Sequence, residues 1–417
     1  MAYLDNIKII KETIWSFASK GIAFLLLFLL NVYLARNLGT DQFGIWTFYF
    51  SLITIFIFLS SFGIDFSTKK FLAQYNNELE LTSVLRSSVK LRFIFSIVFC
   101  VILILIHEPL AIIIGRPEFS YYFLLSVPII LFAGFCEFLK QAFIGLHQIK
   151  YNCVMNTLEY GSKLFLVVVI VPVPLLISDI IKSFTIAYSI SVFIGLYILF
   201  VIFYKKNKKH QINNFTKDIF RYSMPLFIIT IGFLIATEID TVMLGFLSTN
   251  TELGIYGVAK QVVIKLPHVS VAIAMGSMPV FAKLNDDNRK ELKIFFYKLL
   301  KTNTVIYLII TTGILLFSPF FVPMIFGNEY CASVLPLQIL TVYSVVFSYS
   351  ILLGHFLDYQ GLANKRAVFL TISVIINIIL NIILIPEYGA VGAAIATSIS
   401  YFPYIILNWI EVKRFLK

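Results

Sequence analysis

Twelve long apolar segments, each near the length that crosses a bilayer, dominate this sequence of 417 residues. They lie at 13–35, 43–64, 91–106, 120–144, 152–177, 180–204, 219–247, 253–282, 296–317, 331–357, 367–385 and 389–410. A helix needs about 20 apolar residues to cross a hydrocarbon core. Charged residues make up only 13% of the chain, against roughly 25% in an ordinary soluble domain. The pattern predicts an all-α polytopic membrane protein with twelve transmembrane helices.

The basic residues are distributed unevenly when these spans alternate from a cytoplasmic N-terminus. The net charge is +11, but most lysines and arginines then fall on the cytoplasmic side, and only Arg36 and Arg116 reach the other. Such asymmetry follows the positive-inside rule. We therefore expect both termini in the cytoplasm, and we read the charge as a topology signal rather than as a nucleic-acid surface.

Three short motifs recur in the same order in the two halves of the chain. Leu38–Trp46 matches Leu247–Tyr256, Gly115–Phe119 matches Gly327–Tyr330, and Gly145–Lys150 matches Gly361–Arg366. The basic run Lys205–His210 follows the sixth predicted span. We therefore expect two six-helix lobes, 1–209 and 210–417, related by a pseudo-two-fold axis along the membrane normal. This organisation is typical of transporters whose substrate path lies between two halves.

Four lysines lie deep inside predicted spans, where a charge costs about 2.5–3.5 kcal/mol on insertion scales. They are Lys20, Lys163, Lys260 and Lys265. A deep charge normally faces a wet cavity or a partner, so the four predict a cationic lining suited to an anionic headgroup such as a pyrophosphate. Lys140 and Lys182 lie nearer span ends, where lysine side chains can snorkel to water.

Ion pairing is the alternative for two of these lysines. Lys260 lies at a depth that matches Glu238 and Asp240 on the preceding span, and Lys163 follows Glu159 by four residues on one helix. Lys20 and Lys265 have no acidic neighbour in sequence and are the better cavity candidates.

Other carboxylates suggest further roles. Glu238 and Asp240 are candidates for ion coupling, because a carboxylate within the membrane can carry a proton or bind Na⁺. Asp65 with Lys69, and Glu137 with Lys140 or Gln141, read as structural pairs. The small residues of 389–400, Thr397 among them, read as a helix-packing stripe. No Walker-type loop, metal-ligand spacing or nucleophile elbow occurs, which favours a transporter without cofactor or metal over an enzyme.

Several motifs together resemble the polysaccharide (Wzx-type) flippases, which belong to the superfamily shared with lipid II flippases and multidrug and toxin extruders. They are Glu238–Gly245 followed by Leu253–Ala259, the opening hairpin with Trp15–Ser16, Leu34–Gly39 and Phe43–Trp46, and Gly145–Gln148. The resemblance implies alternating access and a cation-lined cavity. Relatives often place arginines in that cavity, whereas this chain has no arginine deep inside a predicted span, and Arg92 is expected on the cytoplasmic side.

The resemblance also implies a substrate and a location. Members move undecaprenyl-pyrophosphate-linked oligosaccharide units across the bacterial inner membrane, before polymerisation into O-antigen, as in lipopolysaccharide, or into capsule. The implied partners are that lipid-linked substrate, a coupling cation (H⁺ or Na⁺), membrane lipids and the polymerase of the pathway. The alternatives are a multidrug or metabolite antiporter of the same fold and, with less support, a membrane polymerase or acyltransferase.

Overall fold

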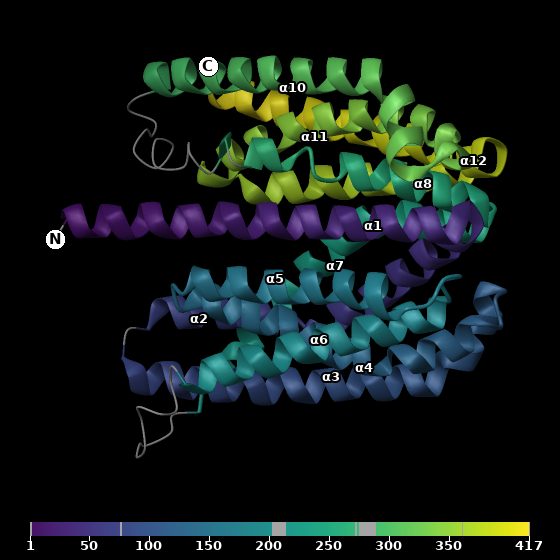
Figure 1. Cartoon of the computed structure of the whole chain (residues 1–417). Helices are drawn as coiled ribbons and strands as arrows, with labels where there is room; N and C mark the ends of the chain where they lie inside the picture. Colours follow the sequence, from purple (N-terminus) through teal and green to yellow (C-terminus); the bar gives the residue numbers. More distant parts are fainter. Residues whose placement is uncertain are drawn as a thin grey trace. The chain divides into compact units, whose positions relative to one another are not determined.

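The computed structural model describes residues 2–75, 77–201, 214–271, 273–274, 289–360 and 362–416, and every regular element in these ranges is helical (Figure 1). The first half contains α1 (Ala2–Ser61), α2 (Ile64–Gln74), α3 (Glu78–Ile114), α4 (Phe119–Gly145), α5 (Ile149–Phe165), the π-helical turn η1 (Leu166–Ile170) and α6 (Ile177–Leu199). The second contains α7 (Thr216–Leu247), α8 (Asn250–Val263), α10 (Arg289–Phe326), the 3₁₀ turn η4 (Asn328–Ser333), α11 (Val334–Tyr359) and α12 (Ala363–Phe415).

The described helices confirm a multi-pass membrane protein. Eight are long and apolar enough to cross a bilayer, and the bent α7 makes a ninth. The apolar regions of α1 and α12 have 48 and 52 residues, or about 72 and 78 Å at 1.5 Å per residue. Each is therefore long enough for two crossings. The predicted number of twelve spans stays a prediction, because part of 253–282 lies outside the described residues.

Single glycines break the two longest helices. Gly39 in α1 has φ 73° and Gly389 in α12 has φ 53°, in the left-handed region that glycine adopts without a steric penalty. The sequence predicts loops at 36–42 and 386–388. The structure instead keeps helix on both sides of one residue, because helical hydrogen bonding resumes directly after each glycine.

Helix ends elsewhere follow the repeated motifs. Gly115 (φ 75°) ends α3, and its repeat counterpart Gly327 (φ 114°) follows α10. The Asn77 side chain caps α3 by accepting from the Leu79 N–H at 3.1 Å, and the Thr249 hydroxyl caps α8. The capped α3 starts 13 residues before the predicted span at 91, since its first turns are polar.

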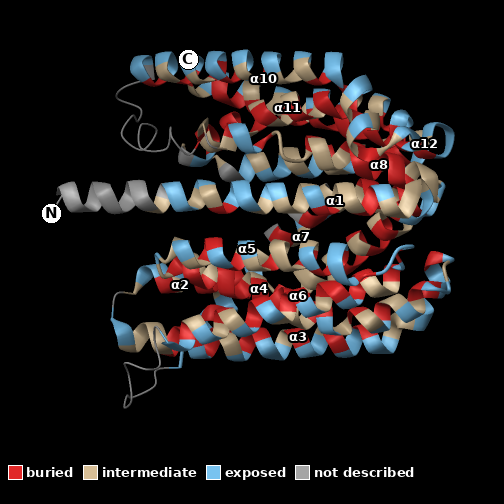
Figure 2. Ribbon diagram, in the orientation of Figure 1, coloured by how far each residue is buried: buried red, intermediate tan, exposed pale blue. Residues whose placement is uncertain are grey.

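The described residues form two compact units, defined by their internal contacts. The first unit comprises Met1–Asn37 and Tyr49–Leu234, and the second comprises Leu38–Phe48 and Ile235–Lys417. Within the first, α4 packs against α2, α3, α5 and α6; within the second, α11 packs against α8, α10 and α12. Buried residues line these packed faces (Figure 2). The predicted lobe boundary at 209/210 lies outside the described residues and stays a prediction.

The outward faces of the helices are apolar as well. On α3 this face includes the exposed side chains of Phe93, Ile97, Val101 and Leu105. An exposed apolar stripe of this length would be an aggregation surface in water, whereas a bilayer solvates it.

In the second unit, the repeat-related segments around Gly44 and Gly254 contact each other reciprocally. A Cβ at Gly44 would overlap the Asn250 carbonyl oxygen, and a Cβ at Gly254 would overlap that of Thr40. The Thr251 hydroxyl also hydrogen-bonds the Asp41 carboxylate. Each glycine therefore permits a backbone approach that no other residue type would allow. We call this contact the glycine clasp.

Candidate substrate and ion-coupling sites

A buried carboxylate forms the centre of a polar cluster in the second unit. Asp240 of α7 is only 4% exposed. It accepts hydrogen bonds from the Tyr256 hydroxyl of α8 at 3.2 Å, and from Asn381 Nδ2 and the Thr397 hydroxyl of α12, each at 2.7 Å. Asn381 and Thr397 lie on opposite sides of the Gly389 break. The two halves of α12 thus converge on one carboxylate.

The cluster around Asp240 is rich in oxygen atoms and poor in positive charge. All its donors are neutral, and among the described residues no cation lies within ion-pair distance of Asp240. Asn377 Oδ1 accepts from Asn381 at 3.1 Å, while the buried Asn381 Oδ1 has no hydrogen-bond partner in the described part of the chain. Carboxylate, amide and hydroxyl oxygens are the ligands that hard cations prefer, and a carboxylate can also take up a proton.

Glu238 and Lys260 form an ion pair beside this cluster. Lys260 Nζ lies 3.1 Å from Glu238 Oε2 and 2.8 Å from the Thr241 hydroxyl. Of the two carboxylates that match Lys260 in depth, the structure thus pairs it with Glu238 and leaves Asp240 uncompensated. Sequence spacing could not distinguish them, because the choice depends on the rotation of α7 relative to α8.

A second charge cluster is buried in the first unit, where α4 and α5 meet. Glu159 accepts from both Lys163 (2.6 Å) and Lys140, and Lys140 Nζ also lies 3.6 Å from Glu137. Lys163 additionally lies 3.8 Å from the Tyr188 ring centroid. The predicted Glu159–Lys163 pair is confirmed. The snorkelling predicted for Lys140 is wrong: its side chain is 8% exposed because α5 covers it.

The remaining two predicted lysines differ in their surroundings. Lys20 of α1 is exposed, next to the buried Ser19, which hydrogen-bonds Asn152 and Asn156 of α5. Lys265 is half-buried in the turn Ile264–Pro267 that ends α8, and the Tyr307 hydroxyl of α10 binds the Leu266 carbonyl in this turn at 2.7 Å. Neither lysine has an acidic partner among the described residues.

Two features of the structure were not predicted from the sequence. Arg92, expected at the cytoplasmic end of its span, is fully buried and donates to the carbonyls of Gly134 and Ser60. Its guanidinium also lies 3.4 Å from the Asp65 carboxylate. Asp65 therefore pairs with Arg92, and the predicted pair with Lys69 is wrong. Thr397, interpreted as packing only, binds Asp240. The i, i+4 asparagines Asn377 and Asn381 in an isoleucine-rich span were a usable signal.

Comparison with known proteins identifies the family. The model of the family described as "Polysaccharide biosynthesis protein" matches residues 9–285. The chain belongs to this family. An uncharacterized membrane protein of Methanocaldococcus jannaschii is 26% identical over 99% of this chain and 98% of its own length. A probable low-salt glycan biosynthesis flippase, Agl15 of Haloferax volcanii, is 28% identical over 48% of this chain and 43% of its own length.

Solved structures of other membrane proteins share the fold. Lipid II flippase MurJ, in an inward closed conformation, matches with a TM-score of 0.75 and 17% identity, covering 97% of this chain and 87% of that one. The helical elements, the apolar spans and this structural similarity confirm the predicted fold class of an all-α polytopic membrane protein. Among the described residues, no group of three or more His, Cys, Asp or Glu could hold a metal ion.

Proposed function

We propose that this protein is a flippase that moves a polyprenyl-pyrophosphate-linked oligosaccharide from the cytoplasmic to the opposite leaflet. The observation that carries the proposal is Lys265, a half-buried cation at a helix break in an apolar unit, without an acidic partner among the described residues. A charge in such a place is costly unless it meets an anion or water. A pyrophosphate headgroup supplies that anion, and family membership supports a glycan precursor.

The lysines divide between two roles in this proposal. Lys265 binds the headgroup and Lys20 stays a separate candidate for this role, whereas the ion pairs of Lys163 and Lys260 favour the structural alternative for these two. Asp240, rather than the paired Glu238, couples transport to H⁺ or Na⁺ through its oxygen-rich surroundings. In a bacterium the carrier would be undecaprenyl pyrophosphate, the location the cytoplasmic membrane, and both termini cytoplasmic.

The same uncompensated Asp240 also suits the second candidate, an antiporter for organic cations. The two functions differ in the charge of the substrate. A flippase requires Lys265 for an anionic headgroup, whereas an antiporter of cations would gain from removing it. The similarity to proteins named as flippases supports a transporter over an enzyme of glycan assembly.

A reconstituted assay separates these functions. Purified protein in liposomes is given a fluorescent polyprenyl-pyrophosphate disaccharide in the inner leaflet, and its arrival outside is followed by chemical quenching. We expect protein-dependent transfer that Lys265→Ala lowers at least tenfold and that the exposed control Lys182→Ala leaves intact. Transfer equal to that of protein-free liposomes, or efflux of an organic cation that Lys265→Ala increases, would contradict the proposal.

A further inference from the structure

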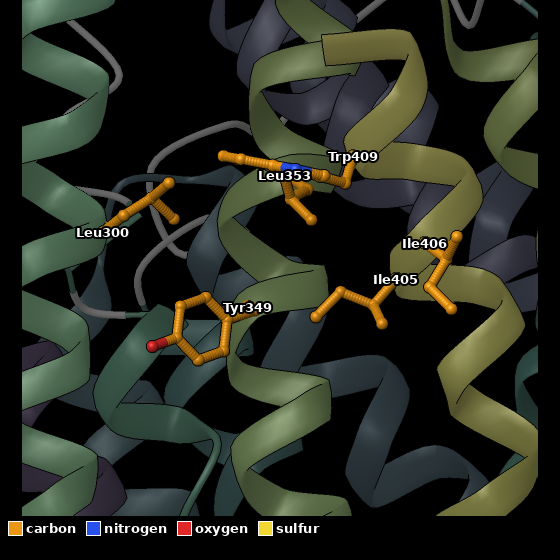
Figure 3. A pocket seen from close by; sticks show the side chains of 6 residues that line it. All are labelled: Leu300, Tyr349, Leu353, Ile405, Ile406 and Trp409. Carbon is orange, nitrogen blue, oxygen red and sulfur yellow. The ribbon is translucent and has the colours of Figure 1, made fainter. Parts of the chain in front are cut away.

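A pocket of about 290 Å³ opens between α10, α11 and α12 in the second unit (Figure 3). Its lining consists of Leu300, Tyr349, Leu353, Ile405, Ile406 and Trp409. Trp409 and Leu353 lie together at one end of the pocket, and Tyr349 and Ile405 lie at the other (Figure 3). The volume is just below the roughly 300–1,000 Å³ typical of small-molecule sites.

The pocket offers hydrocarbon and aromatic surface. Leu300 and Leu353 in its lining are buried, whereas Ile406 is exposed. The Tyr349 hydroxyl hydrogen-bonds the Thr304 hydroxyl at 2.6 Å, so one of its polar interactions is satisfied within the protein. A ligand that fills this space must therefore be apolar along the part that enters it.

A cation lies one helical turn beyond the pocket. Lys413 Nζ is 5.2 Å from the centroid of the Trp409 ring. The nearby carboxylate Glu411 is already bound by Lys365 (2.8 Å) and Arg414 (2.9 Å). Among the described residues Lys413 has no acidic partner, so it is available to an anion. An apolar pocket thus ends beside an uncompensated positive charge.

We propose that this pocket binds the first isoprene units of a polyprenyl phosphate lipid, with the phosphate held by Lys413. In that lipid the hydrocarbon begins directly at the phosphate ester. In a diacyl phospholipid, glycerol and two carboxylic esters separate phosphate from chain. A pocket lined by aliphatic and aromatic side chains, one turn of about 5.4 Å from a cation, fits the first lipid better. This inference rests on the proposed function and names the part of its substrate that docks here.

The pocket is separate from Lys265 along α10. The turn that carries Lys265 contacts α10 at Tyr307, two helical turns after Leu300. Leu300 and Trp409 lie toward the basic ends of α10 and α12, which the charge distribution places at the cytoplasmic face. The pocket therefore serves as a loading site, from which the headgroup passes on to Lys265.

Photolabelling of the full chain in phosphatidylcholine nanodiscs tests this site. The probe is benzophenone-geranyl monophosphate, and the competitors are farnesyl phosphate, farnesol and dioleoylphosphatidylglycerol. We expect labelling of the peptide that contains 405–409, with farnesyl phosphate competing at least tenfold better than the other two. Lys413→Ala should weaken farnesyl phosphate at least fivefold and leave farnesol unchanged, whereas Lys293→Ala, an exposed lysine on α10, should change neither.

Two substitutions that fill the pocket test the proposed site most directly. Leu353→Trp, at a buried lining position, and Ile406→Trp, at an exposed one, should each reduce labelling at least tenfold, and Ile406→Trp guards against loss through misfolding. Equal competition by phosphatidylglycerol, or full labelling of Ile406→Trp, would overturn the proposal. The two proposals fail separately. A filled-pocket variant that loses labelling but keeps normal transfer of the lipid-linked disaccharide refutes the loading site. Wild-type protein that is labelled but does not transfer this substrate refutes the flippase.

Discussion

Individual buried charges in this protein differ in whether another charge compensates them. Glu159 is shared by two lysines and Glu238 is paired with Lys260, whereas Asp240 and Lys265 have no oppositely charged partner in the described part of the chain. Compensated charges stabilise the helix packing. Uncompensated ones are the candidates for binding an ion or an anionic substrate.

The carboxylate of Asp240 is predicted to couple transport to an ion gradient. Asp240→Asn keeps the shape of the side chain but removes its charge, so we expect transport to lose its response to imposed Na⁺ and pH gradients without loss of folding. Flipping in proteoliposomes under each gradient measures this, with Asp218→Asn, exposed at the start of α7, as the control. An unchanged response in Asp240→Asn would exclude this role.

The Glu159 cluster is predicted to act on stability. Glu159→Gln leaves Lys140 and Lys163 uncompensated and buried, and breaking a buried pair in this way costs about 3–5 kcal/mol. We therefore expect a clear fall in the melting temperature of the detergent-purified protein. Asp179→Asn, which breaks an exposed pair with Lys182, should produce no measurable shift. Equal melting temperatures for both variants would refute a structural role for the cluster.

Helices and their interruptions follow the sequence to different degrees. The apolar segments predict the helical elements, and i, i+4 spacing predicts contacts within one helix, as for Glu159 with Lys163 or Glu137 with Gln141. Contacts between helices, such as Thr397 with Asp240, depend on helix rotation that one sequence does not reveal. Helix propensity likewise cannot tell a loop from the single-residue break at Gly389.

The glycine clasp is predicted to tolerate no side chain. Gly44→Ala forces a Cβ into the Asn250 carbonyl, and overpacking of this kind typically costs about 1–3 kcal/mol. Gly21→Ala, on the same helix, meets open space and should stabilise α1 by about 0.5–1 kcal/mol. Thermal unfolding of both variants measures the difference. A Gly44→Ala protein as stable as Gly21→Ala would show that the close approach is not required.

For the whole molecule, composition and charge distribution were sufficient to predict the class. A chain with 59% apolar residues and basic residues concentrated on alternate connections is a multi-pass membrane protein, and the family match confirms the predicted resemblance. The predicted arrangement of two six-helix lobes stays a prediction, because the basic run at 205–210, which holds the predicted boundary, lies outside the described residues. The proposed substrate and ion sites depend on side chains that meet only in the folded state.

The most direct test of the flippase proposal is a lipid analysis of a strain that lacks this protein. Polyprenyl-linked species are extracted and identified by mass spectrometry. A membrane-impermeant reagent assigns the leaflet of each species, and the amount of surface glycan is measured in parallel. The flippase proposal predicts that complete single oligosaccharide units accumulate in the cytoplasmic leaflet while surface glycan is lost. Unchanged lipid-linked species with normal surface glycan would contradict it, and unpolymerised units in the outer leaflet would identify a polymerase instead.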